Sequence, residues 1–362
     1  MTRAAWISRL AIGLTVATLS CKDAPTSSTI PPSQYLPART FRMGFSAFPP
    51  RPTNEAALAT IDVWSRRADA AIIHNSVPYQ ALLSGTNAAT YVNTVDLPLA
   101  NIYKAKGLQL AITVDVTDGL NRAAEDPALV ALKRSIAEPA VQLAYRQYVQ
   151  ALVSAIRPEY LGLAAETNLI RGQAPAAVYS AMVQMTNAAA SDVKALGGKQ
   201  PVLYASVQAD FAWGPPPAAY KGVEQDFRDF PFVQAIAISS YPYFVYPDPD
   251  QIPLDYYTRL AAGRTLPILV VEGGWTSASV GQIQSSAAKQ ARYVRRHEKL
   301  LDSAKAVAVF QLTFTDLDLS SFQVPPGSNL PLFASLGFVD ANLSPKAVLA
   351  THDSVFMRPL KK

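Results

Sequence analysis

The sequence predicts an α/β protein whose body folds as a single (β/α)8 TIM barrel. Eight short apolar runs rich in Val, Ile, Leu and Phe alternate with longer segments of helical periodicity. The runs are apolar along most of their length, as expected for parallel strands that are buried on both faces. An open doubly wound sheet is the alternative, but the sequence has no G-x-G-x-x-G motif after the first strand and no phosphate-loop motif.

The expected elements follow one another in regular order along the chain. We expect strands at residues 41–48, 68–75, 108–115, 160–165, 201–208, 233–240, 267–272 and 306–314. We expect amphipathic helices at residues 54–67, 128–156, 174–196 and 280–303, and Gly197 with Gly198 is a typical stop for the third of them. Residues 41–362 therefore form the expected barrel domain.

Composition excludes several other classes of protein. Of the 362 residues 49% are hydrophobic and 16% are charged, which is typical of a globular protein rather than a disordered chain or a coiled coil. Without Arg3 and Arg9 in the N-terminal segment, the chain has 30 basic and 27 acidic residues, which gives a net charge of +3. This small excess of positive charge gives no reason to expect a nucleic-acid partner. A single Cys excludes an internal disulfide, and the three His have no metal-ligand spacing. We expect neither a metal nor another cofactor.

The N-terminal segment has the pattern of an export signal. Arg3 and Arg9 precede an apolar run at residues 10–19 that is too short to span a membrane. Cys21 follows directly and resembles the acylated Cys of bacterial lipoproteins, so we expect a signal peptide at residues 1–20 and lipidation at Cys21. Residues 21–40 are rich in Pro, Ser and Thr and are predicted to form a tether. A membrane-anchored lipoprotein facing the periplasm or cell surface is expected, and a simply secreted protein is the alternative.

Two glutamates stand where a barrel of this kind places its chemistry. Glu166 directly follows the fourth predicted strand and Glu272 ends the seventh, and functional residues of such barrels lie at the carboxyl ends of the strands. A carboxylate next to a buried strand loses its hydration, which costs free energy unless the carboxylate is paired with a charge or takes part in chemistry. Two carboxyl groups facing each other could hydrolyse a glycosidic bond with retention. Alternatively, each glutamate could cap a helix or pair with an Arg such as Arg171.

These positions also resemble a known group of enzymes, the clan A glycoside hydrolases, which carry glutamates at the ends of strands 4 and 7. The segment ILVVEGGW at residues 268–275 is similar to the nucleophile motif of the endo-β-1,4-galactanase and β-1,3-glucanase families, and SSYPYF at residues 239–244 is similar to a strand 6 motif of the galactanases. LGFVDANLSPKAVL at residues 336–349 resembles their closing segment. The resemblance implies a catalytic pair of Glu166 as acid/base and Glu272 as nucleophile, with Tyr241 bonded to the nucleophile.

The chain departs from the family pattern next to the acid/base. The family has an Asn that binds the sugar 2-hydroxyl at the position of Ala165. Three alternatives follow: Asn168 or another side chain makes this bond, the substrate is unusual, or the barrel only binds glycans.

Several side chains near the strand ends are candidate sugar contacts because sugar rings stack on flat apolar surfaces. The aromatic candidates are Trp213, Tyr241, Tyr243 and Trp275, and Phe211, Phe244 and Tyr246 lie near them in the sequence. His74 and Asp115 close the second and third strands and could face the same site, although a structural role is an equal alternative for each.

The sequence thus predicts an exported retaining glycoside hydrolase that cleaves a β-linked polysaccharide or oligosaccharide. The alternative is a non-catalytic glycan-binding surface lipoprotein on the same barrel. In either case the expected partners are a carbohydrate and, through the lipid anchor, a membrane, and the protein is expected to be a monomer.

Overall fold

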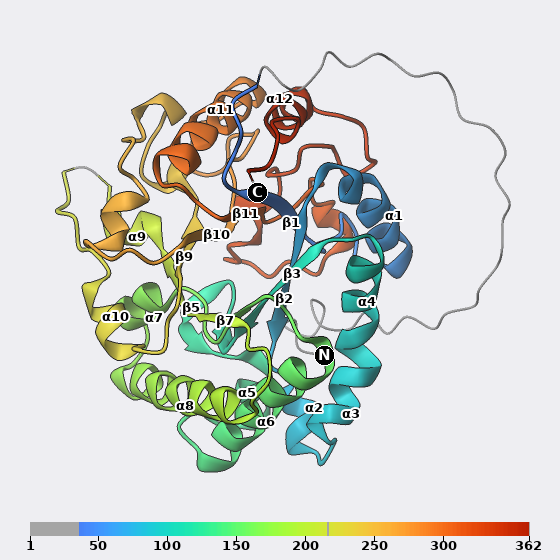
Figure 1. Ribbon diagram of the computed structural model, residues 1–362, viewed down its shortest axis with the longest axis vertical. Coiled ribbons are helices and arrows are strands. Elements are labelled where there is room, and N and C mark those ends of the chain that lie inside the picture. The colour runs from blue at the N-terminus through green and yellow to red at the C-terminus, as the bar shows by residue number, and fades with distance from the viewer. Residues whose placement is uncertain (1–35, 216, 362) are drawn as a thin grey trace, which may run out of the picture.

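The computed structural model describes residues 36–215 and 217–361. In this part of the chain a nine-stranded parallel sheet has the order β7-β6-β3-β2-β1-β11-β10-β9-β8 (Figure 1). Its strands are β1 (Arg42–Ser46), β2 (Ala70–Ser76), β3 (Gln109–Asp115), β6 (Tyr160–Gly162), β7 (Val202–Tyr204), β8 (Ser206–Gln208), β9 (Ile236–Ser240), β10 (Ile268–Gly273) and β11 (Ala308–Gln311). Only Ala205 separates β7 from β8, so the two ends of the sheet are segments of one strand. The sheet therefore closes into a barrel, and the predicted (β/α)8 fold is confirmed.

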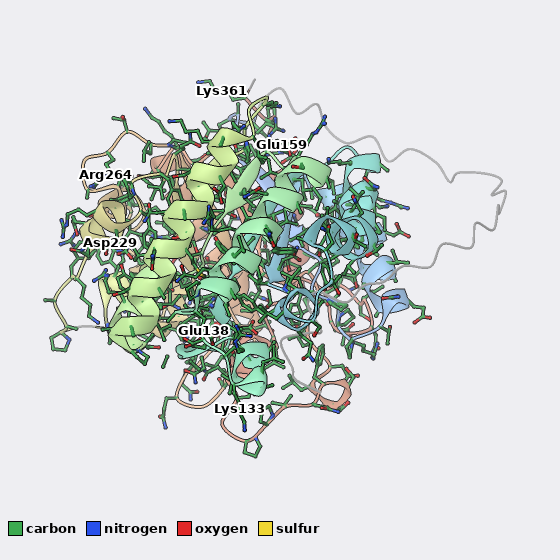
Figure 2. All side chains as sticks on the ribbon, turned by 90° about the horizontal axis from the view of Figure 1, so that it is seen from below. Lys133, Glu138, Glu159, Asp229, Arg264 and Lys361 are labelled. Atoms are coloured by element: carbon green, nitrogen blue, oxygen red, sulfur yellow. The ribbon has the colours of Figure 1, made fainter. Side chains whose placement is uncertain are left out.

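Helices surround the barrel (Figure 1). They are α1 (Asn54–Trp64), α2 (Tyr79–Leu83), α3 (Ala88–Tyr91), α4 (Leu97–Ala105), α5 (Pro127–Leu132), α6 (Pro139–Ile156), α7 (Thr167–Gln173), α8 (Ala176–Ala195), α9 (Ala209–Trp213), α10 (Glu224–Asp229), α11 (Ala287–Ser303) and α12 (Ala347–Phe356). Figure 2 shows the two long helices α6 and α8 side by side on the outside, where Arg146 Nε lies 2.6 Å from Asp192 Oδ2.

Two of the predicted helices have different limits in the structure. The segment predicted as one helix at residues 128–156 is two helices, because Lys133 takes a left-handed backbone conformation (φ 54°) after α5 and Pro139 begins α6. Proline is well suited to a first helical position but not to a helix interior. The helix predicted from residue 280 begins only at Ala287, where the Ser286 hydroxyl accepts a hydrogen bond from the Lys289 amide.

Side chains alternate between the inside and the outside of the barrel. On β2, Ala70 and Ile72 belong to the inner apolar cluster, whereas Ala71 and Ile73 belong to the outer cluster under the helices. This two-residue period is what a strand requires when both of its faces are buried. Inside the barrel, the Tyr204 ring occupies the space that a side chain at Gly162 would fill.

The folded body begins slightly before the predicted boundary at residue 41. Arg39 is only 3% exposed, and its guanidinium pairs with Asp69 at 2.7 Å. The backbone of Arg39 also forms a parallel bridge with Leu360 near the other end of the chain. These contacts place Arg39 in the barrel domain rather than in the predicted tether. The signal peptide and Cys21 lie outside the described residues, and no helix in residues 36–215 and 217–361 is long and apolar enough to cross a membrane.

Candidate active site

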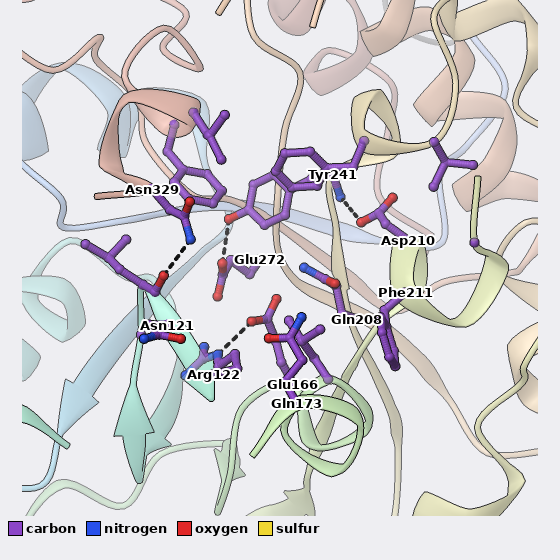
Figure 3. Close-up of a pocket in the computed structure, with 18 of the residues that line it drawn as sticks. Asn121, Arg122, Glu166, Gln173, Gln208, Asp210, Phe211, Tyr241, Glu272 and Asn329 are labelled. Atoms are coloured by element: carbon purple, nitrogen blue, oxygen red, sulfur yellow. Dashed lines mark hydrogen bonds and ion pairs between the residues drawn. The ribbon is translucent and has the colours of Figure 1, made fainter. Parts of the chain in front are cut away.

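A pocket of about 360 Å³ lies at the carboxyl ends of the barrel strands (Figure 3). Both predicted glutamates, Glu166 and Glu272, line it, although 106 positions separate them in the sequence numbering (272 − 166 = 106). The other lining residues come from the end of β8 and from the segments that follow β3, β6, β8, β9 and β11: Gly119, Leu120, Asn121, Arg122, Leu169, Gln173, Gln208, Asp210, Phe211, Gly214, Pro215, Lys221, Tyr241, Phe244, Val245, Asn329, Leu332 and Phe333. The closed barrel thus brings the two carboxyl groups to one site.

Glu272 lies near the end of β10, and its carboxyl group is mostly buried. The Tyr241 hydroxyl, from the residue that follows β9, donates a hydrogen bond of 2.5 Å to Glu272 Oε1. Burial and, to a smaller extent, the charge of Glu166 raise the pKa of Glu272 to about 8, against the opposing effect of the hydrogen bond from Tyr241. Glu272 therefore holds a proton more strongly than an ordinary glutamate does.

His74, near the end of β2, lies beside the same carboxyl group. Its Nδ1 is 3.9 Å from Glu272 Oε2, and its Nε2 is buried without a hydrogen-bond partner in the described residues. Burial lowers the pKa of His74 to about 4, so the imidazole is neutral at pH 7. His74 consequently contacts Glu272 without adding a positive charge to it, and it does not line the pocket.

Glu166 is held by three elements at once. It has a left-handed backbone conformation (φ 51°, ψ 45°) immediately before α7, which is unusual for a residue with a side chain. Its backbone amide donates to Ser206 Oγ at 3.0 Å, and its Oε1 accepts from Ser239 Oγ at 2.6 Å. Its other carboxylate oxygen accepts from Arg122 Nε at 2.8 Å. These contacts aim a 5% exposed carboxylate at the pocket.

Arg122, which the sequence analysis did not identify, connects Glu166 to Asp115. It lies on the hairpin formed by β4 (Thr117–Asp118) and β5 (Asn121–Glu125), and its Nη1 contacts both carboxylate oxygens of Asp115 at 2.7 and 2.6 Å. Although burial opposes it, the charges of Asp115 and Glu166 raise the pKa of Arg122. The Asp118-Gly119 dipeptide, a frequent hairpin signal, could have indicated the hairpin but not the ion pair. Asp115 therefore acts on the pocket through Arg122 rather than by lining it.

Asn168 makes hydrogen bonds within the protein through both its amide nitrogen and its amide oxygen. Its Nδ2 donates to the Gln208 carbonyl at 2.9 Å, and its Oδ1 accepts from the Gln208 amide at 2.8 Å. The side chain is 1% exposed and does not line the pocket, so it joins α7 to β8. Gln208 itself lines the pocket, although no sequence pattern indicated it.

The predicted aromatic contacts separate into two groups. Tyr241 lines the pocket, and so do Phe211 and Phe244. Trp213, Tyr243 and Trp275 do not line it, and their polar atoms bond to protein partners: Trp213 Nε1 to the Tyr256 carbonyl at 3.0 Å, Tyr243 OH to the Leu332 carbonyl at 3.1 Å and Trp275 Nε1 to Ser285 Oγ at 2.9 Å. Trp275 is 1% exposed, so no open ring face remains for a sugar.

Asp210 is a third buried acid at the pocket and was not identified from the sequence. Its Oδ2 accepts from the Tyr241 backbone amide at 2.7 Å, and its Oδ1 accepts from Tyr256 OH at 2.6 Å. Burial raises the pKa of Asp210 to about 7 against the effect of these two hydrogen bonds. Asp210 therefore fixes the backbone of the residue whose hydroxyl reaches Glu272.

The arrangement suits two-step chemistry on an anomeric carbon. Two carboxyl groups share one pocket, and they differ in their partners: Glu166 has a cation and a serine hydroxyl, whereas Glu272 has neutral partners in Tyr241 and His74. Within the described residues, no group of three or more His, Cys, Asp or Glu side chains could hold a metal ion. One carboxylate as nucleophile and one carboxylic acid as proton donor are what glycosidic hydrolysis with retention requires.

Comparison with known proteins supports the fold. No protein-family model matches the sequence, and no curated protein matches it significantly. Among solved structures, an exo-β-1,4-mannosidase from Opitutaceae bacterium strain TAV5 is similar with a TM-score of 0.62 and 16% identity, over 91% of this chain and 62% of that one. A GH5_18 protein from Bifidobacterium longum subsp. longum in complex with Manβ1-4GlcNAc has a TM-score of 0.61 and 14% identity, over 89% of this chain and 80% of that one. Xylanase 10B from Thermotoga maritima has a TM-score of 0.60 and 14% identity, over 88% and 95%.

These similarities, at 16% identity or less, show that the chain has the TIM-barrel fold of these glycoside hydrolases. The chain spans less than two thirds of the length of the mannosidase. A similar fold hosts many activities, so function has to be argued from the site.

Proposed function

We propose that this protein is a retaining glycoside hydrolase that cleaves a β-linked polysaccharide or oligosaccharide. The observation that carries the proposal is the placement of Glu166 and Glu272, from opposite parts of the barrel, in one pocket with different partners. The solved structures with the same fold include a β-1,4-mannosidase, a protein bound to Manβ1-4GlcNAc and a xylanase, which supports a β-linked glycan as the substrate class.

The first step starts from the form of the pair in which the proton lies on Glu166 and Glu272 is ionised. The Glu272 carboxylate attacks the anomeric carbon while the bond from that carbon to the leaving oxygen breaks. Glu166 donates its proton to the departing oxygen. In the second step, the Glu166 carboxylate removes a proton from water, the water oxygen bonds to the anomeric carbon, and Glu272 is released as a carboxylate. Tyr241 orients Glu272 for the attack by its hydrogen bond to Oε1.

A mechanism-based label tests the assignment of the nucleophile. A panel of 2,4-dinitrophenyl 2-deoxy-2-fluoro-β-glycosides should inactivate the protein by forming one covalent adduct, at Glu272, which peptide mass spectrometry would locate. Glu272→Ala should abolish both labelling and turnover and leave the circular dichroism spectrum unchanged. An adduct on another residue, or turnover by Glu272→Ala near the wild-type rate, would refute this role.

A non-catalytic glycan-binding protein is the second candidate, and two observations favour it. The carboxyl group of the proposed acid/base, Glu166, is engaged within the protein by a 2.8 Å ion pair with Arg122, and Ala165 stands where the resembling family has a sugar-binding Asn. Isothermal titration with β-linked oligosaccharides would distinguish the two: the second candidate predicts heat of binding without any release of product.

We also propose that the protein is exported and anchored to a membrane through an acylated Cys21, and that it is a monomer. The basic and apolar leader before Cys21 supports this proposal. The wild-type protein should partition into the detergent phase, Cys21→Ser should move it to the aqueous phase, and sedimentation of the detergent-free variant should report its mass as a single chain. Recovery of the wild-type protein entirely in the aqueous phase, beginning downstream of Cys21, would refute the anchor.

A further inference from the structure

The pocket lies on one side of the barrel mouth. Its lining residues lie on the ends of β8 and β10 or follow β3, β6, β8, β9 and β11, and none of the lining residues in the described chain comes from the loops after β1 or β2. In the sheet, β2 and β1 lie between β3 and β11. A groove that crossed the whole mouth would be lined from that side as well. The site is therefore closed toward β1 and β2.

A hydrogen bond between two distant loops spans this side of the pocket, and we call it the bridge. Asn329, from the loop after β11, donates through Nδ2 to the Leu120 carbonyl at the tip of the β4–β5 hairpin, at 2.8 Å. Figure 3 shows this bond on the side of the pocket where Asn121 and Arg122 lie, away from Gln208 and Phe211. Because the hairpin follows β3, the bridge joins the two loops that flank the β1 and β2 side.

Tyr241 and Tyr243 contact the loop that carries Asn329. Leu332 and Phe333 belong to the short 3-10 helix η9 (Leu330–Phe333), and the Leu332 carbonyl accepts the Tyr243 hydroxyl at 3.1 Å. The Phe333 ring packs against Tyr241 with ring centroids 4.9 Å apart. Tyr243, which does not line the pocket, thus anchors the loop that does.

The loop after β1 contacts the start of the loop that carries Asn329. Arg51 pairs with Asp318 at 3.0 Å, and the Asp318 amide donates to the Pro50 carbonyl at 2.9 Å. These contacts fasten the start of the loop after β11 onto the loop after β1. Leu120 and Asn329 are exposed, but their hydrogen bond joins the two loops across the bridge side. On the other side, near Gln208 and Phe211, the pocket lining ends at Pro215 and Lys221, which are also exposed. A chain longer than the pocket has a path to solvent in that direction.

We propose that the pocket takes one terminal sugar of a β-linked glycan, with the rest of the chain leaving past Phe211, so that the enzyme removes sugars from a chain end. This inference rests on the proposed hydrolase function. The enclosed sugar must be the one attacked by Glu272, because a leaving group trapped behind a covalent glycosyl-enzyme would have no exit and would block the water. The glycan end that enters is therefore the non-reducing end.

The test compares matched pairs of substrates. The probes are p-nitrophenyl β-1,4-oligosaccharides of glucose, mannose and galactose, each free or carrying a 4,6-O-ethylidene cap on its non-reducing sugar. The free member of the accepted pair should release monosaccharides one at a time from the start of the reaction. The capped member should react at least about 100-fold more slowly, because a cap against the bridge displaces the anomeric carbon from Glu272 by an ångström or more.

Opening the bridge should relax this selectivity. Asn329→Ala removes the only hydrogen bond described between Asn329 Nδ2 and the hairpin, so the difference between capped and free substrates should narrow. Asn87→Ala is the matched control, because Asn87 is also exposed but accepts hydrogen bonds from the Ala89 and Thr90 amides outside the pocket. It should leave the difference unchanged.

The outcomes separate the two proposals. Capped and free substrates cleaved at similar rates, with internal fragments as first products, would overturn chain-end action while leaving the hydrolase function intact. If no substrate in the panel turns over, the hydrolase proposal fails. Calorimetric titration of the protein with the same pairs then tests whether the pocket is closed around a terminal sugar. Preferential binding of the free members would support a closed pocket for a terminal sugar, whereas equal binding, or no binding of either member, would refute it.

Discussion

Replacing Tyr241 with Phe tests whether the hydrogen bond from Tyr241 controls the pKa of Glu272. Glu272 has a pKa of about 8, raised by burial and by the Glu166 charge, and the Tyr241 hydroxyl stabilises its ionised form. As the pH rises through about 8, the pair therefore loses its last proton. Hydrolysis of a substrate with a poor leaving group needs that proton on Glu166, so its rate should fall above this pH. A dinitrophenyl glycoside needs no protonation, so its rate should rise through the same pH as Glu272 ionises.

Tyr241→Phe keeps the ring but removes the 2.5 Å hydrogen bond to Glu272 Oε1. A hydrogen bond to a charged group is worth about 1.5–3 kcal/mol, which corresponds to about one to two pKa units. The pKa of Glu272 should rise by that amount. The fall in rate for the poor leaving group and the rise in rate for the dinitrophenyl glycoside should therefore both move to about pH 9–10. Below the original midpoint the fraction of ionised Glu272 should fall by about 10- to 100-fold, and both rates should fall with it.

The assay is kcat/KM between pH 5 and 10 for a β-linked disaccharide and the matching dinitrophenyl glycoside, because kcat/KM reports ionisation of the free enzyme. Tyr243→Phe is the control, since its hydroxyl bonds to the Leu332 carbonyl and to neither carboxyl group. It should leave both midpoints in place. If Tyr241→Phe lowers the rates while the two midpoints stay near pH 8, the hydrogen bond does not control ionisation of Glu272 and the reasoning fails.

Three further substitutions test other parts of the site. Glu166→Gln should lose most activity on substrates with poor leaving groups but keep much of the first step on dinitrophenyl glycosides, and equal losses on both would count against Glu166 as acid/base. Arg122→Ala leaves the carboxylates of Asp115 and Glu166 without their buried cation, so urea unfolding should show a loss of about 3–5 kcal/mol; a change below 1 kcal/mol would mean that water replaces the guanidinium at little cost. Asn168→Ala removes both bonds to the Gln208 backbone and should lower stability by about 1–3 kcal/mol in the same assay, whereas unchanged stability with lost sugar binding would instead place Asn168 on the substrate.

The sequence alone determined the barrel and the placement of its two glutamates. Apolar runs indicate strands because burial acts on each segment locally, and a glutamate that ends such a run lies at the carboxyl end of its strand. The predictions that placed Glu166 directly after the fourth strand and Glu272 at the end of the seventh therefore needed no knowledge of distant contacts. The hydrogen bond from Tyr241 to Glu272 was also anticipated, through the resemblance of the strand 6 segment.

Only the tertiary structure decided what surrounds these glutamates. Arg122 is 44 positions from Glu166, and Leu120 is 209 positions from Asn329, so no local pattern records either pair. The same holds for Trp275, whose place near a strand end suggested a sugar contact but whose ring is buried by the protein itself. Loop sequences show little hydrophobic periodicity. The contacts of their side chains depend on which other loops lie beside them once the barrel has closed. The position of the carboxyl groups is thus a property of the strands, whereas the electrostatics and the closed side of the pocket are properties of the closed barrel.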